Sequence, residues 1–327
     1  MDIFEELKND FPRLEKNISL KNYSTFRIGG PAKYFLRTSD RKELKKIIER
    51  AKKENIKFLI IGGGSNILFS DNGFDGLVIV YRIENLSKES FNVEKKEDRE
   101  NVIVKVDASI PLSLLISELK NLSGLEWGVG IPGTLGGAIN GNAGAFNESI
   151  SDSIESVDIL DISSGDVTER KLKKKDCLFA YRTSIFKENN DLLIVSAELR
   201  LLKDKEEEVK KRINDNLEKR KTKQPKGFSV GSVFKNYFGR LDQKIIKKYP
   251  QLKIFNEKEI IPAGLLIELC DLKGKQIGDA KISDEHANFI INLKNATSSD
   301  VMSLINLIKK SVKEKFLVEL NEEIKFF

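Results

Sequence analysis

Glycine is concentrated in two stretches of this chain, and they constrain its fold more than any other feature. The first stretch, GGGSN at 62–66, directly follows the β-branched run KFLII at 57–61. The second, at 124–146, is dense in glycine and shows no apolar periodicity. A stretch of the second one's length is too long to be an idle connection inside a packed domain.

The first stretch has the character of an anion site. Glycine backbone adopts positive φ easily and approaches a ligand closely, because it carries no Cβ. Consecutive N–H groups of this kind form a concave site that suits a pyrophosphate. No GK[ST] follows, which excludes a P-loop. On spacing alone, a plain tight turn remains the alternative.

The second stretch contains a literal GxGxxG at 128–133, but its context argues against a dinucleotide fingerprint. That fingerprint needs a strand before it and a helix opened by its third glycine. Here Pro132 lies inside the motif and further glycines follow it. We therefore interpret GIPGTLGGAINGNAGAF as a groove lined by backbone.

Composition limits the class of protein. With 327 residues, and domains of about 100–200 residues, two or three packed units are expected. There is no apolar run near the roughly 20 residues of a membrane helix, and the polar start MDIFEELKNDF does not resemble an export signal. We expect a cytoplasmic protein without a membrane partner.

The sequence contains few cysteine and histidine residues that could bind a metal ion. Cys177 and Cys270 are far apart, and His286 is the single histidine. Zinc sites with several histidines are thereby excluded, and a Ser-His-Asp triad would have to use His286. We expect no metal site.

The net charge of +6 and the pI of about 9.0 permit a nucleic-acid binder. However, 56 basic residues are interleaved with 50 acidic ones, and there is no aromatic-basic RNA motif. We therefore expect no nucleic-acid partner, while DNA binding with a steep salt dependence would favour this alternative.

Hydrophobic periodicity predicts alternating helices and strands. The helix at 40–54 has Ser39 as a candidate N-cap, and a separate C-terminal unit is expected after the loop at 224–230. The further predicted helices are 111–119, 206–220, 263–270 and 299–316. The predicted strands are 57–61, 77–81, 102–106, 154–162, 192–202, 287–291 and 323–327.

Short motifs spread over nearly the whole chain carry a resemblance. They are TFRIGGPA (25–32), GGGSN (62–66), GIPGTLGGAINGNAGAF (130–146), YRTSIF (181–186), GSVFKN (231–236), SDEHANFIIN (283–292) and LNEEIKF (320–326). Together they resemble the UDP-N-acetylenolpyruvoylglucosamine reductase (MurB) family, and the second glycine stretch with GSVFKN is the most specific part.

The resemblance implies an α+β chain with an FAD-binding fold of the vanillyl-alcohol-oxidase type. It implies FAD-binding subdomains at 1–83 and 84–205 and a C-terminal α/β substrate domain at 206–327, whose last strand carries Glu323 back to the active site. The resemblance also implies that NADPH reduces the FAD, whose N5 then passes a hydride to the terminal carbon of the enolpyruvyl group of a UDP-sugar. We expect a monomer acting on small molecules.

Hydride addition leaves negative charge beside the substrate carboxylate, which must be stabilised and then protonated. A guanidinium forks onto oxygens and stays charged, and Arg182 in YRTS matches the family's arginine. Ser232 in GSVFKN matches the family's proton donor. Glu323 matches the family's glutamate, and the adjacent Glu322 is the competing choice, because neighbours in a strand face opposite ways.

The resemblance also implies the binding residues. The substrate contacts are Tyr181, Lys223, Asn236 and His286. The predicted FAD contacts come from both glycine stretches: Gly62, Gly63, Gly64, Ser65, Asn66, Ile131, Pro132, Gly133, Gly137, Asn142 and Gly144.

One enzymatic alternative stays open. A cofactor fold fixes FAD but not the chemistry performed with it. Another FAD-dependent oxidoreductase of the same fold, acting on a hydroxylated substrate, would have its flavin reduced by an alcohol rather than by NADPH.

Overall fold

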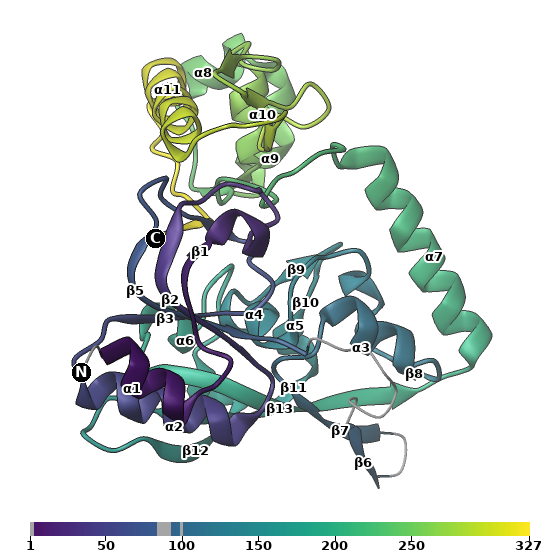
Figure 1. The fold of residues 1–327 in the computed structure, drawn as a ribbon. Coiled ribbons are helices and arrows are strands. Elements are labelled where there is room, and N and C mark those ends of the chain that lie inside the picture. Colours follow the sequence, from purple (N-terminus) through teal and green to yellow (C-terminus); the bar gives the residue numbers. More distant parts are fainter. Residues whose placement is uncertain (1–2, 84–92, 99–100) are drawn as a thin grey trace. The chain divides into compact units, whose positions relative to one another are not determined.

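The structure is a computed structural model that describes residues 3–83, 93–98 and 101–327, with the backbone alone for 93–98 and Lys223. The chain forms two units (Figure 1), each assembled from separate segments. The first unit comprises Met1–Ile18, Ala32–Gly63 and Asp75–Arg220, and the second comprises Ser19–Pro31, Gly64–Phe74 and Lys221–Phe327.

The first unit begins with a four-stranded sheet in the order β1-β2-β5-β3. Strands β3 and β5 are parallel, with Phe58 opposite Leu77. Helices α1 and α2 lie side by side against this sheet and share its apolar core (Figure 1). The elements are α1 (Ile3–Asp10), β1 (Glu15–Ser19), β2 (Pro31–Thr38), α2 (Arg41–Lys53), β3 (Phe58–Ile61) and β5 (Phe74–Tyr81).

Helix α2 forms where its apolar spacing predicts it, but its cap differs from the prediction. Leu44, Ile47 and Ile48 are buried on one face, as expected of an amphipathic helix. The N-cap is Asp40, whose side chain accepts a hydrogen bond from the Lys42 N–H at 2.8 Å. Ser39 as N-cap is therefore wrong, because the helix begins one residue later and the Asp40 carboxylate satisfies its first free N–H group.

A six-stranded antiparallel sheet completes the framework of the first unit. Its order is β12-β11-β13-β7-β6, and β8 also pairs with β13. Alternate residues of β7, namely Val102, Val104 and Val106, are buried in an apolar core with helix α3. The strands are β6 (Val93–Asp98), β7 (Asn101–Asp107), β8 (Leu122–Ser123), β11 (Ile154–Asp161), β12 (Thr168–Lys173) and β13 (Leu192–Lys203).

Short elements connect these strands and carry the glycine-rich segment. Helix α7 (Glu206–Lys223) runs from the end of β13 and finishes in a turn rich in basic residues. The others are α3 (Leu112–Glu118), η3 (Glu126–Gly128), α4 (Leu135–Asn140), β9 (Gly144–Ala145), β10 (Glu148–Ser149), α5 (Ile150–Ser153), η4 (Lys174–Cys177) and α6 (Ile185–Glu188).

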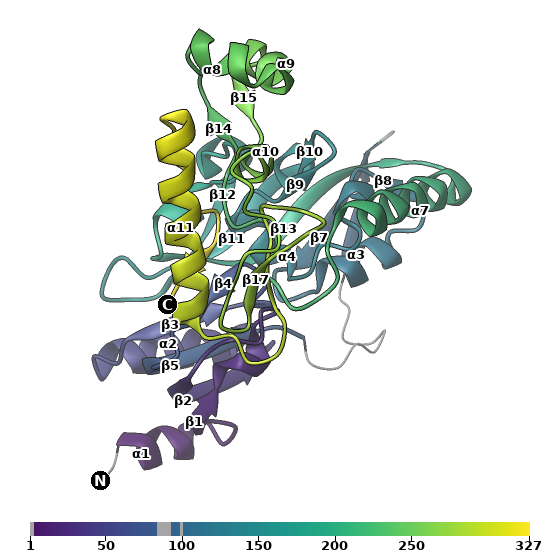
Figure 2. The same cartoon turned by 90° about the horizontal axis from the view of Figure 1, so that it is seen from above.

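The second unit is organised around the long amphipathic helix α11 (Ser298–Phe316) (Figure 2). Its buried face packs against α10 and against the hairpin β16–β17. The remaining elements are η1 (Leu20–Tyr23), β4 (Ile67–Leu68), β14 (Tyr237–Phe238), α8 (Gln243–Lys248), η5 (Pro250–Leu252), α9 (Lys253–Glu257), β15 (Ile260–Ile261), α10 (Ala263–Glu268), β16 (Gln276–Ile277), β17 (Ala280–Ile282), β18 (Ile290–Asn292) and β19 (Lys325–Phe326).

Two segments from the N-terminal third belong to this second unit. Phe26, Ile28 and Leu68 are buried in the same core as α10 and α11. Strand β19 pairs in parallel with β4, which places Lys325 opposite Ile67. The core of the second unit is therefore completed by residues more than half the chain away.

Two strand predictions in this unit need correction. The strand predicted at 287–291 is β18, which starts later because the Phe289 N–H closes a turn onto the His286 carbonyl at 2.9 Å. The strand predicted at 323–327 is the shorter β19, so Glu323 precedes it instead of starting it. The three-domain division stays a prediction, and part of its 83–84 boundary lies outside the described residues.

Candidate active site

The two glycine stretches meet within the first unit. A Cβ on Gly63 would lie 2.6 Å from the Cα of Gly133, and a Cβ on Gly62 would collide with Oγ1 of Thr134. Backbones approach this closely only where no side chain intervenes. Three predicted FAD contacts, Gly62, Gly63 and Gly133, are thus brought into one surface lined by backbone.

The context of the second stretch agrees with its interpretation as a groove. It follows the 3₁₀ turn η3 and not a strand, which excludes the Rossmann fingerprint. Thr134 is the N-cap of α4, and its hydroxyl accepts from the Gly137 N–H at 3.3 Å. Among the predicted contacts here, Ile131 is half-buried, while Pro132 and Gly137 are exposed.

Asn142 and Gly144 connect this stretch to the turn that carries Arg182. The Asn142 amide donates to the Ala180 carbonyl at 2.8 Å, and its oxygen accepts from the Ser151 N–H at 3.3 Å. The Gly144 carbonyl accepts from Nη2 of Arg182 at 2.6 Å. Their contacts therefore hold the arginine turn against the glycine stretch.

Arg182 has an uncommon backbone conformation, with a φ of 54° in the left-handed region. Paired hydrogen bonds between Ala180 and Thr183, at 3.1 and 3.2 Å, close the turn around it. Its guanidinium lies 5.4 Å from the ring centroid of Tyr181, which is itself exposed. Non-glycine residues held in this region cluster at functional sites, so the turn is a candidate for ligand binding.

The second unit brings Asn66, Ser232 and Glu323 close together. The Glu323 N–H donates to the carbonyl of Val233, the residue after Ser232, at 2.8 Å. The Asn66 amide donates to the Glu323 carbonyl at 3.1 Å, and the Lys325 N–H donates to the Asn66 carbonyl at 3.0 Å. Within the described residues, the hydroxyl of Ser232 has no hydrogen-bond partner, which leaves it available to a ligand.

Glu322 and Glu323 have different surroundings. Glu322 forms a β-bridge with Phe234, and its carboxylate accepts from Nζ of Lys309 at 2.8 Å in a salt bridge. Glu323 is half-buried and follows directly. The Lys309 partner gives Glu322 a structural role, and the assignment of Glu323 as the catalytic carboxylate stays a prediction.

His286 packs inside the second unit beside the serine loop. Its ring contacts Phe289 edge-on at 4.9 Å, and Nδ1 accepts from the Asn288 N–H at 3.2 Å. Burial lowers the pKa of its imidazole, because the charged form loses hydration. A neutral imidazole that uses Nδ1 as an acceptor keeps Nε2–H as a donor.

The other predicted substrate residues are less informative. The oxygen of Asn236 accepts from the Ala263 N–H at 3.3 Å, at the start of α10. The side chain of Lys223, at the end of α7, lies outside the described residues. In the second unit, Gly64 accepts from the Thr25 N–H at 3.1 Å, and Ser65 next to it is half-buried.

Sequence reasoning missed two residues that shape these loops. Asn288 accepts from the Phe234 N–H at 3.0 Å and donates to the Phe234 carbonyl at 2.8 Å, which fixes the loop after Ser232. Thr134 caps α4 and touches Gly62. Asn288 lies inside a quoted motif, and a threonine before a short apolar run is a helix-start signal, so both had a usable signal.

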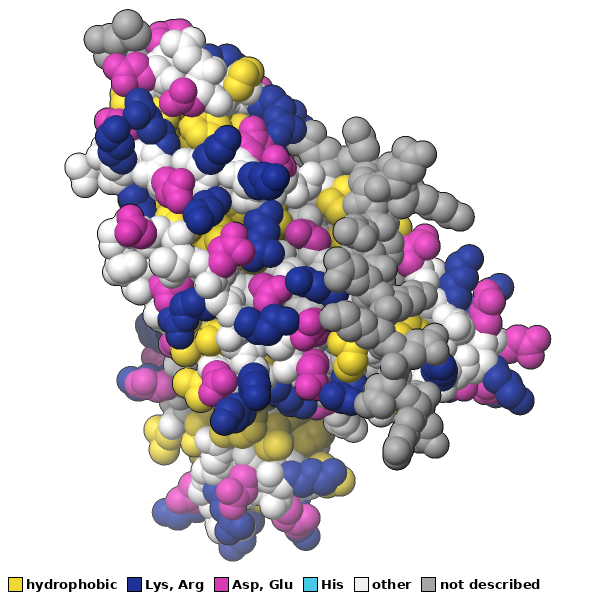
Figure 3. All heavy atoms as spheres, turned by 90° about the horizontal axis from the view of Figure 1, so that it is seen from below, with side chains coloured by type: hydrophobic (Ala, Val, Ile, Leu, Met, Phe, Trp, Pro, Cys, Tyr) yellow, Lys and Arg dark blue, Asp and Glu magenta, His cyan; other side chains and the backbone are white. Residues whose placement is uncertain are grey.

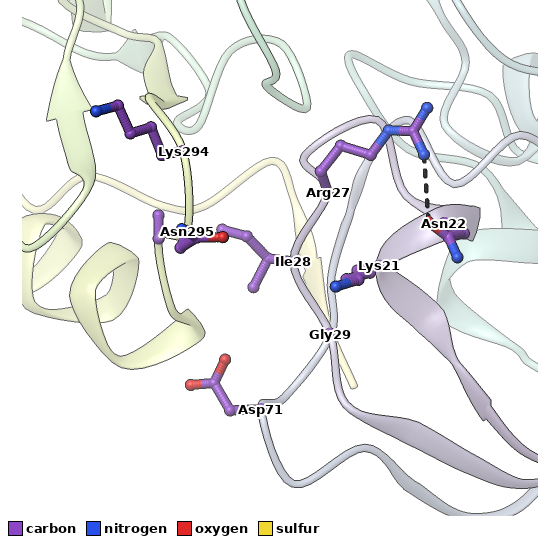
Figure 4. Close-up of a pocket in the computed structure, with 9 residues that line it drawn as sticks. Lys21, Asn22, Arg27, Ile28, Gly29, Asp71, Lys294 and Asn295 are labelled. Carbon is purple, nitrogen blue, oxygen red and sulfur yellow. Dashed lines mark hydrogen bonds between the residues drawn. The ribbon is translucent and has the colours of Figure 1, made fainter.

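A separate pocket of about 320 Å³ lies in the second unit (Figure 4). Arg27 reaches Asn22 there at 3.5 Å, and the carboxylate of Asp71 accepts from the N–H and hydroxyl of Ser298. None of the predicted site residues lines it. This pocket therefore plays no part in the site proposed below.

The described residues offer neither a cluster of metal ligands nor a membrane-spanning helix. No group of three or more His, Cys, Asp or Glu side chains there could hold a metal ion. No helix in the described ranges is both long and apolar enough to cross a membrane.

Comparison with known proteins defines the class. Residues 32–170 match an FAD binding domain, and residues 223–327 match the C-terminal domain of UDP-N-acetylenolpyruvoylglucosamine reductase. The fold is therefore that of an FAD-dependent oxidoreductase, which confirms the predicted α+β fold class with an FAD-binding fold and the predicted cofactor FAD.

Full-length relatives identify the family. The enzyme named UDP-N-acetylenolpyruvoylglucosamine reductase from Clostridium novyi is 36% identical over 99% of this chain and 96% of its own length. The one from Prochlorococcus marinus is 37% identical over 96% and 97%. The crystal structure of the reductase from Thermus caldophilus covers 96% of this chain and 99% of its own, with 31% identity and a TM-score of 0.71. The chain belongs to the UDP-N-acetylenolpyruvoylglucosamine reductase family, so the predicted family is confirmed.

Proposed function

We propose that this chain catalyses the reaction of its family with the residues described above. That reaction is the NADPH-dependent and FAD-mediated reduction of UDP-N-acetylglucosamine enolpyruvate to UDP-N-acetylmuramate for peptidoglycan synthesis. The single observation that carries the proposal is the contact between Gly63 and Gly133, where two glycine turns share one surface without side chains. Such a surface fits a dinucleotide, because its pyrophosphate needs close backbone N–H donors.

The residues that would hold FAD are those predicted from the two glycine stretches. Gly62, Gly63 and Gly133 supply the close backbone approach, and Gly144 and Asn142 hold the adjoining turn. When bound there, FAD would supply hydride chemistry for the enolpyruvyl group, with NADPH as the reductant. Stabilisation of the developing charge, donation of the proton and binding of the substrate are left to side chains of the protein.

Arg182 is the proposed stabiliser of the negative charge that develops on the substrate carboxylate. Its fixed position supports this role, because Gly144 and Tyr181 restrain the guanidinium before any ligand arrives. A donor that is already oriented needs no reorganisation as charge develops, which is the main source of electrostatic catalysis.

Ser232 is the proposed proton donor to the carbon next to the carboxylate. Support comes from its hydroxyl, which has no partner among the described residues, and from the hydrogen bond between Val233 and Glu323 beside it. A serine hydroxyl is a weak acid, so it needs neighbouring polar groups to transfer its proton. Glu323 is the proposed carboxylate for this task.

Tyr181, Asn236, His286 and Lys223 remain the proposed substrate contacts. His286 is neutral and has an Nε2–H donor left, so it suits a hydroxyl or carbonyl of a nucleotide sugar better than it suits a phosphate. Lys223 is the proposed cation for the pyrophosphate of the substrate.

The enzyme is further proposed to act in the cytoplasm, as a monomer, and on small molecules without nucleic-acid or membrane partners. On the face shown in Figure 3, basic and acidic side chains are interspersed over the described surface instead of gathering into a basic patch. Nucleic-acid binding needs clustered positive charge, so this distribution supports small molecules as the ligands.

The test is a two-stage stopped-flow experiment on the purified yellow protein. NADPH should bleach the flavin absorbance, and UDP-N-acetylglucosamine enolpyruvate should restore it under anaerobic conditions. An alcohol should leave the spectrum unchanged. Absence of a flavin spectrum after refolding with FAD, or bleaching by an alcohol and not by NADPH, would contradict the proposal.

A further inference from the structure

The loop at 232–234, which begins with the proposed proton donor Ser232, is anchored to one buried side chain. Phe234 is 1% exposed, so its backbone N–H and carbonyl need partners inside the protein. The side chain of Asn288 supplies both. Its oxygen accepts from the Phe234 N–H at 3.0 Å, and its amide nitrogen donates to the Phe234 carbonyl at 2.8 Å.

The backbone around Asn288 contacts the same loop. The Asn288 carbonyl accepts from the Val233 N–H at 2.8 Å, and Ser232 forms a β-bridge with Phe289. On the C-terminal segment, the Glu323 N–H donates to the Val233 carbonyl at 2.8 Å. Because the N–H and the carbonyl of one residue bind two different segments, the loop is fixed between them.

The residue before Ser232 contributes little to its position. Gly231 has a φ of 81°, and nothing lies within 4 Å of the place that a Cβ on it would occupy. No side-chain packing therefore holds the chain at this residue. The Ser232 hydroxyl has no hydrogen-bond partner among the described residues. Its position depends on the residues that follow it, and these are bound to Asn288.

Asn288 also contacts His286, a proposed substrate residue. The Asn288 N–H donates to Nδ1 of the imidazole at 3.2 Å. A neutral imidazole that accepts at Nδ1 carries its proton on Nε2, so this bond selects the ring nitrogen that can donate to a ligand. Asn288 thus contacts both the proton-donor loop and a residue proposed to bind the substrate.

We propose that Asn288 is a positioning residue for this reaction, and that its side chain keeps the Ser232 hydroxyl where it can donate a proton to the substrate. The inference rests on the function proposed above and deepens it. Ser232 is the group that would touch the substrate, and Asn288 acts through it. An asparagine suits this task, because its planar amide offers an acceptor and a donor that match the N–H and carbonyl of one backbone residue.

Proton donation is the step that this arrangement serves. A serine hydroxyl is a weak acid, so its transfer depends closely on its distance and direction to the carbon that accepts the proton. Reduction of the flavin by NADPH needs no proton from Ser232. Loss of the Asn288 side chain should therefore slow the half of the reaction in which the substrate reoxidises the flavin, and it should leave the other half unchanged.

The test compares two buried asparagines of the second unit in the FAD-loaded protein. Asn288→Ala removes both side-chain bonds to Phe234. The matched control is Asn256→Ala, because Asn256 is also buried and accepts from the Leu241 N–H at 2.6 Å, outside the proposed site. Each variant leaves a backbone N–H without its acceptor, so both should lower Tm. A purely structural role of Asn288 predicts that the two variants behave alike in every other measurement.

Anaerobic stopped-flow absorbance follows the two halves of the reaction separately. NADPH should reduce both variants at the wild-type rate. Reoxidation by UDP-N-acetylglucosamine enolpyruvate should be roughly 10- to 100-fold slower in Asn288→Ala alone, which is the effect of displacing a reacting group by about 1 Å. The substrate concentration that gives half the maximal rate should stay near the wild-type value, because the backbone N–H that binds His286 is retained.

Asn288→Asp provides a second variant of nearly the same size. Its carboxylate can accept from the Phe234 N–H but cannot donate to the Phe234 carbonyl, so reoxidation should again be slowed selectively. In both Asn288 variants proton donation should limit reoxidation, and the rate should therefore fall more in D₂O than the wild-type rate does. If Asn288→Ala does not fold, Asn288→Asp decides the question by itself.

The outcomes separate this inference from the proposed function. Reoxidation of the Asn288 variants at the rate of Asn256→Ala would overturn the inference, as would equal slowing of both halves of the reaction. A wild-type solvent isotope effect in slowed variants would also overturn it, since the proton would not be the cause. If the wild type is not reoxidised by the enolpyruvyl sugar, the proposed function itself fails, and this inference fails with it.

Discussion

The side-chain amide of Asn66 donates to the backbone carbonyl of Glu323 at 3.1 Å, and it joins the end of the first glycine stretch to the C-terminal segment. The Asn66 carbonyl accepts from the Lys325 N–H at 3.0 Å, so the contact involves both the side chain and the backbone of this residue. Directly after these two residues in the sequence, β4 and β19 pair in parallel. A predicted cofactor residue thus positions a predicted catalytic carboxylate.

Replacement of Asn66 should therefore reduce turnover by displacing Glu323. Asn66→Ala removes the side-chain donor and leaves the β4–β19 pairing in place. Displacement of a catalytic group by about 1 Å can slow a reaction roughly 100-fold, so we expect kcat to fall roughly 10- to 100-fold in steady-state assays. Asn72→Ala, at an exposed position in the same unit, should leave kcat unchanged. A normal kcat in Asn66→Ala would show that this hydrogen bond does not position the carboxylate.

The contact between the glycine turns makes a second prediction. Gly63→Ala places a methyl group 2.6 Å from the Cα of Gly133, closer than two carbon atoms can pack, so one turn must move. Such overpacking costs about 1–3 kcal/mol, and the displaced backbone should also weaken FAD binding. Thermal unfolding and FAD titration of the apoprotein measure the two effects. Gly165→Ala, where nothing lies within 4 Å of the new methyl group, is the control and should match the wild type in both.

The order of elements in the first unit was predictable from local signals. Apolar spacing at Leu44, Ile47 and Ile48 indicated α2, and the KFLII run indicated β3, because burial of one face leaves a period in the sequence. The cap was misplaced by one residue, since Ser39 and Asp40 both have capping side chains and only the backbone geometry distinguishes them.

The composition of the second unit was not predictable in the same way. Phe26, Ile28 and Leu68 join a core made mostly of residues after 230, and nothing in their immediate sequence indicates that partner. The start of β19 was misjudged for a related reason. Lys325–Phe326 is a strand because Ile67–Leu68 is available to pair with it, and long-range pairing leaves a weak local signal.

Sequence motifs predicted individual site residues, but they did not predict the residues that hold the neighbouring loops in place. Ser232 and Arg182 were named from GSVFKN and YRTS, whereas Thr134 and Asn288 were not named. Thr134 caps α4 beside Gly62, and Asn288 holds the loop after Ser232. These contacts exist only in the folded chain.

Removal of the proposed proton donor should separate the two halves of the reaction. Ser232→Ala should slow turnover roughly 10²- to 10⁴-fold, the contribution of a positioned general acid. Reduction of the flavin by NADPH should continue at the wild-type rate, because that step needs no proton from Ser232. Stopped-flow absorbance resolves the two steps. Ser303→Ala, on the exposed face of α11, is the control; a Ser232→Ala enzyme that turns over like it would remove the assigned role.

The single histidine makes the pH dependence of stability simple to interpret. Burial lowers the pKa of His286 in the folded protein, so below its unfolded pKa of about 6.5 the unfolded chain binds more protons than the folded one. Stability is then fully present above that pH and is lost as pH falls toward the folded pKa, with a slope of at most about 1.4 kcal/mol per pH unit for one proton. Urea unfolding between pH 7 and pH 5.5, above the range where most carboxylates titrate, should show this decline. His286→Asn should flatten it, because no other histidine is present; an unchanged slope in that variant would assign the proton uptake to a different group.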